Sequence, residues 1–279
     1  MQAKVQPRND FLETILAAKR AELTRARQRV PETELRRRAE ARRPDRGFGR
    51  VLDQPGRYGA NVIAEVKRAS PSKGPIRPDL DPALLARSYE AGGAAALSVL
   101  TDARFFSGSP ADLEAARAAV RLPVLRKDFI LSAYQIYETA VLGADALLFI
   151  VRALSAEFLR DALALSRELG LDALVEVHSE PELETALHCG ARLIGINSRD
   201  LATFQTDLDT VARLRGLLGD RAVAVAESGI GGRADILRLL NAGVHNFLIG
   251  ESLVRSPDPE AALRDLLGRP PGADMGTAG

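Results

Sequence analysis

The sequence predicts an α/β fold: a single (β/α)8 TIM barrel that carries an N-terminal helical extension. Three observations support this fold: eight short apolar segments alternate with helical segments, charged residues follow the apolar segments, and two glycine-rich turns come late in the chain. A length of 279 residues suits one large barrel or two small domains. We expect residues 1–47 to form the extension, 48–268 the barrel and 269–279 a disordered tail.

Eight apolar segments rich in Val, Ile and Leu are the expected strands. Each is bounded by Gly, Pro or polar residues and is apolar on both faces, as a buried parallel strand requires. The segments are 62–66, 96–100, 123–126, 146–151, 173–177, 193–196, 222–226 and 246–249. Their starts are roughly 20–35 residues apart, which leaves room for a helix in each right-handed crossover.

Residues typical of helix ends lie between these segments. Ser132 with Gln135, and Ser179 with Glu182, have the spacing of a capping box at a helix start. Two further helix starts are the pairs Asp81-Pro82 and Ser109-Pro110. Glycines stand where a left-handed residue closes a helix, at Gly143, Gly170, Gly190, Gly219 and Gly243. Strand and helix therefore alternate through the whole segment assigned to the barrel.

An open, doubly wound sheet is the alternative arrangement for such units. Its dinucleotide-binding version places the fingerprint G-x-G-x-x-G directly after the first strand. The first expected strand is followed instead by KRASPSKG, at residues 67–74. The closed barrel is therefore favoured.

The residues before the barrel have a helical pattern. Phe11, Leu12, Ile15, Leu16 and Leu23 form an apolar stripe, and Asp10 and Glu13 are suited to cap the helix start. Pro31 ends this helix, and a second, Arg-rich helix is expected from about 32 to 42. The stripe needs a surface to cover, and the barrel is the expected partner.

Charge and composition argue against several classes of partner. Residues 1–50 carry fourteen Lys and Arg against seven Asp and Glu, yet they have few aromatic residues and no nucleic-acid motif. The longest apolar stretch, 144–151, is too short to span a membrane, and the N-terminus has no signal-peptide pattern. Cys189, the single cysteine, rules out an internal disulfide and is interpreted as a packing residue. We expect a cytoplasmic protein that binds neither nucleic acid nor membrane.

Polar and charged residues follow five of the expected strands. They are Glu65, Lys67 and Ser70; Lys127 and Asp128; Glu176; Asn197 and Arg199; and Glu227 and Ser228. In barrels of this kind the active site lies at the carboxyl ends of the strands. Any one of these residues alone could be a structural ion-pair partner, but their convergence predicts a catalytic or binding site. Asp128 is expected to face outward or to cap a loop. His178 is expected to lie near the mouth of the barrel, which is the opening at the carboxyl ends of the strands.

The last two strands lead into glycine-rich turns, ESGIGG at 227–232 and IGES at 249–252. Turns at these two places form the usual phosphate site of a barrel, because their backbone N–H groups face the anion. The three histidines and one cysteine have no metal-ligand spacing. We therefore predict a phosphorylated small-molecule substrate, no metal and no cofactor.

Taken together, these residues resemble one family, indole-3-glycerol-phosphate synthase. The resemblance covers about residues 48–255 and is carried by IAEVKRASPSKG (63–74), LSVLTD (97–102), FFSGS (105–109), LPVLRKDFI (122–130), GADALLFI (143–150), LVEVHSE (174–180), IGINSRDL (194–201), AESGI (226–230) and LIGESLV (248–254). The sequence departs from the family at Ser198, where a second Asn is frequent, and at Val254, where Met is common. Neither position is expected to take part in the chemistry.

The resemblance implies a reaction and roles for the residues. The substrate would be 1-(o-carboxyphenylamino)-1-deoxyribulose 5-phosphate, and the products indole-3-glycerol phosphate, CO₂ and water. Catalytic roles are implied for Lys127 as general acid, Glu176 as its acid–base partner, Lys67, Glu65, Asn197, Glu227 and Ser228. Substrate contacts are implied for Ser70, Arg199, Phe106, Phe129, Leu148 and Leu201, and phosphate contacts for Gly229, Gly250 and Glu251. We expect crowding by other cations to lower the pKa of Lys127.

Other functions remain open at this point. Phosphoribosylanthranilate isomerase would share the phosphate turns, but it needs a cysteine at the mouth. A Schiff-base aldolase could use Lys67 or Lys127 as its nucleophile. A non-catalytic barrel that serves as a binding module is the third class. We expect a monomer or weak homodimer, with transient contacts to other enzymes of tryptophan biosynthesis.

Overall fold

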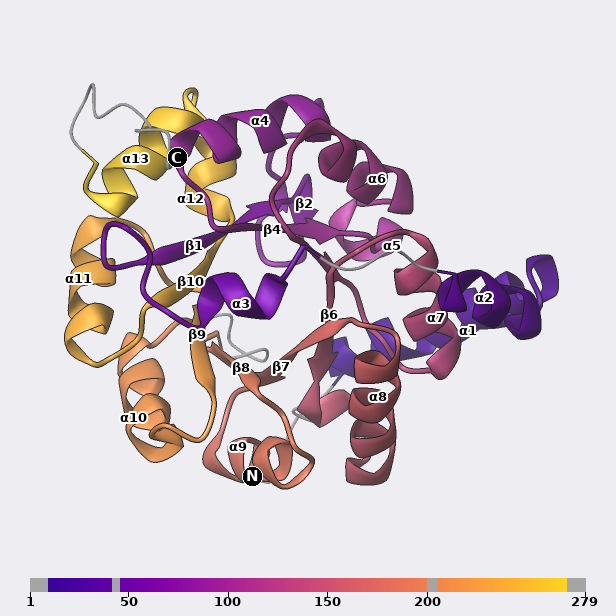
Figure 1. Ribbon diagram of the computed structural model, residues 1–279. Coiled ribbons are helices and arrows are strands. Elements are labelled where there is room, and N and C mark those ends of the chain that lie inside the picture. Colours follow the sequence, from indigo (N-terminus) through magenta and orange to yellow (C-terminus); the bar gives the residue numbers. More distant parts are fainter. Residues whose placement is uncertain (1–9, 42–45, 200–204, 270–279) are drawn as a thin grey trace, which may run out of the picture.

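The structure is a computed structural model that describes residues 10–41, 46–199 and 205–269. Its centre is a closed barrel of eight parallel strands (Figure 1), with each strand hydrogen-bonded to its neighbours in the order β1-β10-β9-β8-β7-β6-β5-β4. The strands are β1 (Asn61–Val66), β4 (Ala96–Leu100), β5 (Val124–Lys127), β6 (Ala146–Ile150), β7 (Asp172–Val177), β8 (Leu193–Asn197), β9 (Val223–Glu227) and β10 (Asn246–Ile249). The closed barrel is confirmed, and the open sheet is excluded.

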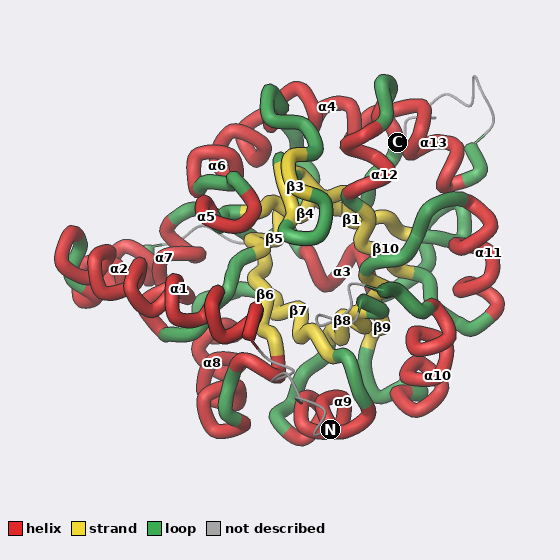
Figure 2. The backbone as a smooth tube through the Cα atoms, turned by 180° about the vertical axis from the view of Figure 1, so that it is seen from behind, coloured by secondary structure: helices red, strands yellow, loops and turns green. Residues whose placement is uncertain are grey.

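Helices connect the strands and surround the barrel (Figure 2). They are α4 (Pro82–Gly92), α6 (Pro110–Ala119), α7 (Ala133–Val141), α8 (Ala156–Glu168), α9 (Glu180–His188), α10 (Leu208–Leu218), α11 (Arg233–Asn241) and α13 (Pro259–Leu267). Shorter elements sit in the connections: α5 (Ala103–Phe106), η1 (Val151–Ala153), α12 (Glu251–Arg255), and the hairpin of β2 (Ala69–Ser70) with β3 (Gly74–Pro75). The strand–helix alternation read from the sequence is therefore present throughout.

The predicted helix caps are present, with one difference. Ser132 and Ser179 accept hydrogen bonds from the backbone of Tyr134 and Glu182, as N-caps do. In a capping box the third helical residue accepts a hydrogen bond from the backbone N–H of the N-cap residue. Here the acceptor side chain bonds instead to the N–H of the residue before the N-cap. The Gln135 side chain accepts from the Leu131 N–H, and the Glu182 carboxylate accepts from the N–H of residue 178. All five predicted C-terminal glycines have positive φ angles.

A short helix that the sequence pattern did not indicate covers the amino-terminal end of the barrel. α3 (Phe48–Leu52) buries Phe48 and Leu52 among the side chains that fill the barrel interior. Figure 1 looks onto this end, with α3 across the centre of the strands. The Asp172 carboxylate accepts a 2.7 Å hydrogen bond from the Gly49 N–H and so ties α3 to β7. The opposite, carboxyl-terminal end is therefore the end left for a site.

Two helices precede the barrel, α1 (Asp10–Arg29) and α2 (Glu32–Glu40). They begin and end close to the predicted positions. Leu12, Ile15 and Leu16 of the apolar stripe are buried, and Tyr134 of α7 donates hydrogen bonds to two backbone carbonyls at the end of α1. These contacts hold α1 against α7 of the barrel.

The end of the chain is placed as far as Arg269. Its guanidinium donates to the carbonyls of Ala91 and Gly92 and lies over the Tyr58 ring. The remainder of the predicted disordered tail lies outside the described residues. In the described part of the chain, no helix is long and apolar enough to cross a membrane.

Candidate active site

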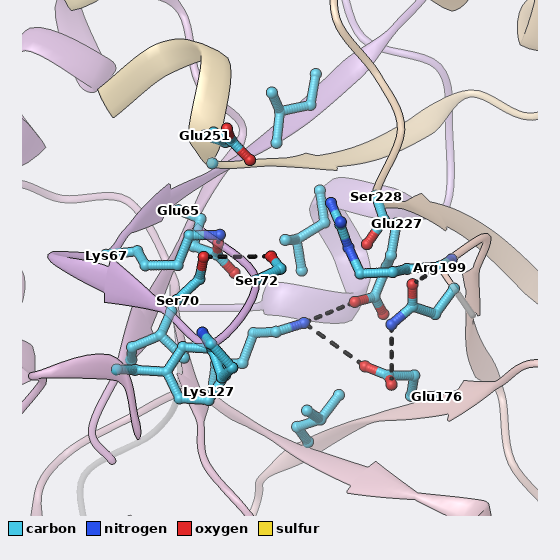
Figure 3. A pocket seen from close by; sticks show the side chains of 18 of the residues that line it. Glu65, Lys67, Ser70, Ser72, Lys127, Glu176, Arg199, Glu227, Ser228 and Glu251 are labelled. Carbon is cyan, nitrogen blue, oxygen red and sulfur yellow. Dashed lines mark hydrogen bonds and ion pairs between the residues drawn. The ribbon is translucent and has the colours of Figure 1, made fainter. Parts of the chain in front are cut away.

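A cavity of about 440 Å³ opens at the carboxyl-terminal end of the barrel. Its lining includes the predicted site residues Glu65, Lys67, Ser70, Phe106, Lys127, Phe129, Leu148, Glu176, Asn197, Arg199, Glu227, Ser228, Gly229, Gly250 and Glu251. Leu201, the remaining predicted residue, lies outside the described residues. Strands from all around the barrel therefore bring their predicted residues to one cavity (Figure 3).

The period-2 geometry of the strands explains this convergence. Leu125, Leu174 and Val225 point into the barrel interior. Two residues further along the same strands come Lys127, Glu176 and Glu227, which therefore face the same interior, one layer closer to the mouth. The apolar layer below supports these charged side chains and keeps water away from them.

Lys127 is the centre of the charged layer. Its Nζ donates a 2.6 Å hydrogen bond to Glu227 Oε2 and lies 3.7 Å from Glu176 Oε2 (Figure 3). Asn197 Nδ2 holds the other Glu176 oxygen at 3.1 Å. On the other side of the cavity, Lys67 Nζ lies 2.5 Å from Glu65 Oε1. Two lysines are therefore each held by carboxylates whose strands are fixed by the barrel.

The expected effect on the pKa of Lys127 is wrong in direction. Burial acts to lower this pKa, but the carboxylates of Glu227, Glu176 and Glu65 outweigh it and raise the pKa above its usual value. The expectation of a cationic mouth came from the lysines and arginines near the strand ends. Around Lys127 the nearest charges are negative, so its ammonium form is stabilised.

The carboxylates divide into two kinds. Burial tends to raise the pKa of each, yet the cations overcome it for Glu176 and Glu65, whose pKa values are lowered, chiefly by Lys127 and Lys67 respectively. Burial prevails for Glu227, and together with the charges of Glu176 and Glu65 it raises the pKa of Glu227 to about 7, despite the bond to Lys127. Glu176 is thus held as a carboxylate, while Glu227 can carry a proton near neutral pH.

Two glycines make room for these carboxylates. A Cβ atom at Gly195 in β8 would lie 2.0 Å from Glu227 Oε1, and one at Gly250 would lie 2.3 Å from Glu65 Oε1. Gly250 was predicted to allow close approach of backbone to phosphate. The structure shows that it also leaves the space that Glu65 occupies. Gly195 was not predicted, although a glycine inside a strand often marks such a close approach.

The apolar wall of the cavity comes from the barrel and from α1. Phe106 and Phe129 lie with ring centroids 6.3 Å apart, as part of the predicted wall. Phe11, Leu12 and Ile15 of α1 also line the cavity. The apolar stripe was predicted to cover the barrel, but the place of these three side chains in the cavity lining was not predicted.

Asp128 was expected to face outward or to cap a loop, and its carboxylate accepts hydrogen bonds from the Phe129 N–H at 2.8 Å and from the Thr101 hydroxyl at 2.6 Å. It follows Lys127 by one residue and is buried at the edge of the cavity, where its carboxylate contacts α1. Lys19 of α1 lies 2.9 Å from its carboxylate and 3.0 Å from that of Asp102, and Arg126 lies 3.1 Å from it. Lys19 itself is buried, so α1 is anchored beside the mouth by a desolvated ion-pair cluster.

The turns after β9 and β10 have the backbone of a ligand-binding loop. Ser228 and Gly229 both have positive φ, at 64° and 74°, and Ser228 is one of two such non-glycine residues among those described. Gly250 precedes α12, and the Glu251 carboxylate lies 3.2 Å from Arg255 and 3.9 Å from Lys73. Backbone N–H groups at these turns suit an anion.

The remaining candidates lie outside the cavity. Cys189 is buried at the end of α9, where its thiol donates to the Ala156 carbonyl, as a packing residue does. His178 is not part of the lining; the chain turns into α9 after β7 and places the imidazole behind Glu176. No group of three or more His, Cys, Asp or Glu side chains within the described ranges is arranged to hold a metal ion.

The sequence is similar to those of known proteins of one enzyme family. A sequence model of the family described as indole-3-glycerol phosphate synthase matches residues 12–266. A protein of that name from Syntrophobacter fumaroxidans is 56% identical over 260 residues, covering 93% of this chain and 98% of the relative. Another, from Desulfosudis oleivorans, is 56% identical over 259 residues, covering 92% and 98%.

Solved structures share the architecture at low sequence identity. The 3-hexulose-6-phosphate synthase of Salmonella typhimurium superposes with a TM-score of 0.60 at 10% identity. The match covers 75% of this chain and 97% of that protein. At such identity the likeness concerns the barrel alone.

Proposed function

This chain belongs to the indole-3-glycerol-phosphate synthase family, and we propose how the mouth of its barrel performs the reaction. Such an enzyme is a carboxy-lyase of tryptophan biosynthesis. It closes the pyrrole ring of 1-(o-carboxyphenylamino)-1-deoxyribulose 5-phosphate and releases CO₂ and water. An aromatic carbon attacks a ketone, the carboxylate leaves as CO₂, and the resulting hydroxyl departs as water.

Lys127 is the general acid of this proposal. The single observation that carries it is the position of Nζ, 2.6 Å from Glu227 and 3.7 Å from Glu176, at the centre of the cavity. These carboxylates keep the amine protonated, so a proton is in place when the ketone oxygen gains charge. An alkoxide is more basic than an amine, so the proton moves to it as the ring closes.

Glu176 is the proposed base. Its lowered pKa keeps it ionised, as required of a group that takes a proton from the forming indole. Asn197 fixes one of its oxygens. Lys67, held by Glu65, faces the same cavity and supplies a second ammonium for the departing hydroxyl. Both lysines and the base therefore face one cavity, with Lys127 Nζ 3.7 Å from Glu176.

The rest of the lining would position the substrate. The aryl ring would lie against Phe106, Phe129 and Leu148, with its carboxylate toward Arg199 and Ser70. The phosphate would meet the backbone N–H groups of Gly229, Gly250 and Glu251, beside the Ser228 side chain. These assignments are supported by the shared cavity and the φ values of the β9 turn.

The purified protein and the substrate test this proposal. We expect indole fluorescence to appear together with one equivalent of CO₂, without added cofactor. An aldolase using Lys67 or Lys127 would instead be trapped covalently by borohydride during turnover. Trapping without indole formation would contradict the proposal.

Three further points belong to the proposal. Residues 1–47 act as an extension and 48–268 as the catalytic barrel, which the Lys19 anchor and the α1 wall support. The enzyme works in the cytoplasm as a monomer or weak homodimer, with transient contacts to other enzymes of the pathway. Light scattering across a concentration series measures the oligomeric state.

A further inference from the structure

Behind Glu176, away from the cavity, lies a chain of ionisable side chains with no role in the chemistry described so far. His178 Nε2 is 3.3 Å from Glu176 Oε1, and His178 Nδ1 is 3.3 Å from Glu182 Oε2. Arg152 donates to the other Glu182 oxygen at 2.9 and 3.1 Å. The exposed fraction of the side chains rises from 5% at His178 to 17% at Glu182 and 27% at Arg152. The chain thus runs from the buried base to the surface.

Glu182 fixes His178 twice. Its Oε2 accepts from the backbone N–H of His178 at 2.8 Å and also faces the ring Nδ1. Ser179, the N-cap of α9, holds the Glu182 backbone in turn. The imidazole therefore has a defined orientation, with its other nitrogen directed at Glu176.

Both ring nitrogens of His178 face carboxylate oxygens. A neutral imidazole has one N–H and one lone pair, so one of these contacts would be repulsive, whereas the imidazolium donates from both nitrogens. Nε2 is buried and makes no hydrogen bond of good geometry to any described residue, so Glu176 Oε1 is the acceptor within reach. The ring therefore lies between two carboxylates, with one nitrogen directed at each.

We propose that His178, held by Glu182, is a positioning residue that orients Glu176 and keeps it ionised as the base of the reaction. This inference rests on the role given to Glu176 under the proposed function. The titratable and charged groups around the pair are Lys127, Glu227 and Glu65 on the cavity side and Glu182 and Arg152 on the surface side. His178 does not line the cavity, so it acts through Glu176 and not on the substrate.

The pH dependence of kcat tests the proposal in the full-length enzyme. Below the pKa of Glu176 the base is protonated and kcat falls. A cation beside a carboxylate lowers its pKa, and His178 contributes to the lowering at Glu176. His178→Gln should therefore move the acid limb of the kcat profile to higher pH and lower kcat about tenfold near neutral pH, within the range of acid–base effects. KM should change little, because the ring does not touch the cavity.

Matched variants separate this effect from a general loss of structure. Glu182→Gln keeps the imidazole and should shift the acid limb in the same direction by a smaller amount. His188→Gln and Glu184→Gln lie on the exposed side of the same helix, α9, and should leave kcat, KM and the pH profile unchanged. If His178→Gln does not fold, Glu182→Gln alone carries the test.

The outcomes are distinct from those for the proposed function. A wild-type enzyme that makes no indole-3-glycerol phosphate would overturn the proposed function itself. An active wild type, inactivated by Glu176→Gln but with unshifted acid limbs in His178→Gln and Glu182→Gln, would overturn only the role of His178. A rise in KM with unchanged kcat would do the same.

Discussion

Gly195 shows how strongly a single missing methyl group shapes this site. Its hydrogen occupies the place where a Cβ atom would meet Glu227 Oε1 at 2.0 Å. Glu227 is enclosed by the barrel and bonded to Lys127. A Cβ at 195 would displace the Glu227 carboxylate, which holds Lys127, so the position of Lys127 depends on the absence of a side chain at 195.

Gly195→Ala should therefore lower kcat by about ten- to a hundredfold, below the effect of losing a general acid outright. Once displaced, Glu227 would no longer hold Lys127 in its present position. The matched control is Gly216→Ala in α10, where a Cβ meets nothing within 4 Å. That change should leave kcat intact and raise the free energy of unfolding by up to about 1 kcal/mol. Equal kcat values in the two variants would contradict this account.

The raised pKa of Glu227 also predicts how the free energy of unfolding depends on pH. Its pKa of about 7 in the folded protein exceeds the ordinary value of 4.5 because burial disfavours its charge. Between these values the folded state holds a proton that the unfolded state has lost. The stabilisation is complete below pH 4.5 and is lost as the pH rises to 7, by a few kcal/mol at about 1.4 kcal/mol per pKa unit.

Glu227→Gln removes this loss, because the amide stays neutral. The melting temperature of the variant minus that of the wild type should thus increase from pH 5 to pH 8. Thermal unfolding followed by circular dichroism measures the difference. Glu184→Gln, at the surface, should show a difference that stays flat over the same range. A flat difference for Glu227→Gln as well would mean that Glu227 is already ionised at pH 5.

At the scale of elements, α1 is both a wall of the cavity and a separate piece of the chain. Its hydrophobic stripe provides area, but Lys19 provides the specific contact, between Asp102 and Asp128. Asp128 is adjacent to Lys127 in sequence, so the anchor and the proposed acid share one strand end. Substitution of Lys19 should therefore lower the free energy of unfolding and weaken substrate binding.

Lys19→Met leaves two buried carboxylates without this cation and should cost about 3–5 kcal/mol of unfolding free energy. KM should rise, because Phe11, Leu12 and Ile15 would no longer be held against the substrate. Arg20→Met, the exposed neighbour on the same helix, is the control and should change neither quantity. A Lys19→Met enzyme with wild-type KM would show that α1 does not help to bind substrate.

On the scale of the whole molecule, the barrel and most of the residues at its mouth were predictable, because the pattern of residues within each strand specifies which side chains face the interior. A buried strand repeats every two residues, so Leu125 pointing inward places Lys127 above it, and Leu174 does the same for Glu176. The helix caps were predictable for the same reason, because a capping residue and the N–H groups that it accepts from are only two or three residues apart in sequence. The predicted strands agree with the observed ones to within about one residue for this reason.

Contacts between distant segments were not predictable in the same way. Lys19 and Asp128 are far apart in sequence, and nothing local marks them as partners. The pKa of Lys127 depends on three carboxylates from other strands, so its direction could not be derived from LRKDF alone. His178 illustrates the same limit, since only the turn after β7 decides whether it faces the cavity or lies behind Glu176.

The kcat of Lys127→Ala, measured by indole fluorescence against the wild type, tests the central claim most directly. Circular dichroism should show that both proteins are folded at the assay temperature. The account predicts a loss of about 10²–10⁴-fold in kcat, with Glu176→Gln similarly impaired and Glu184→Gln fully active. A folded Lys127→Ala enzyme with a kcat comparable to that of the wild type would remove Lys127 from the mechanism.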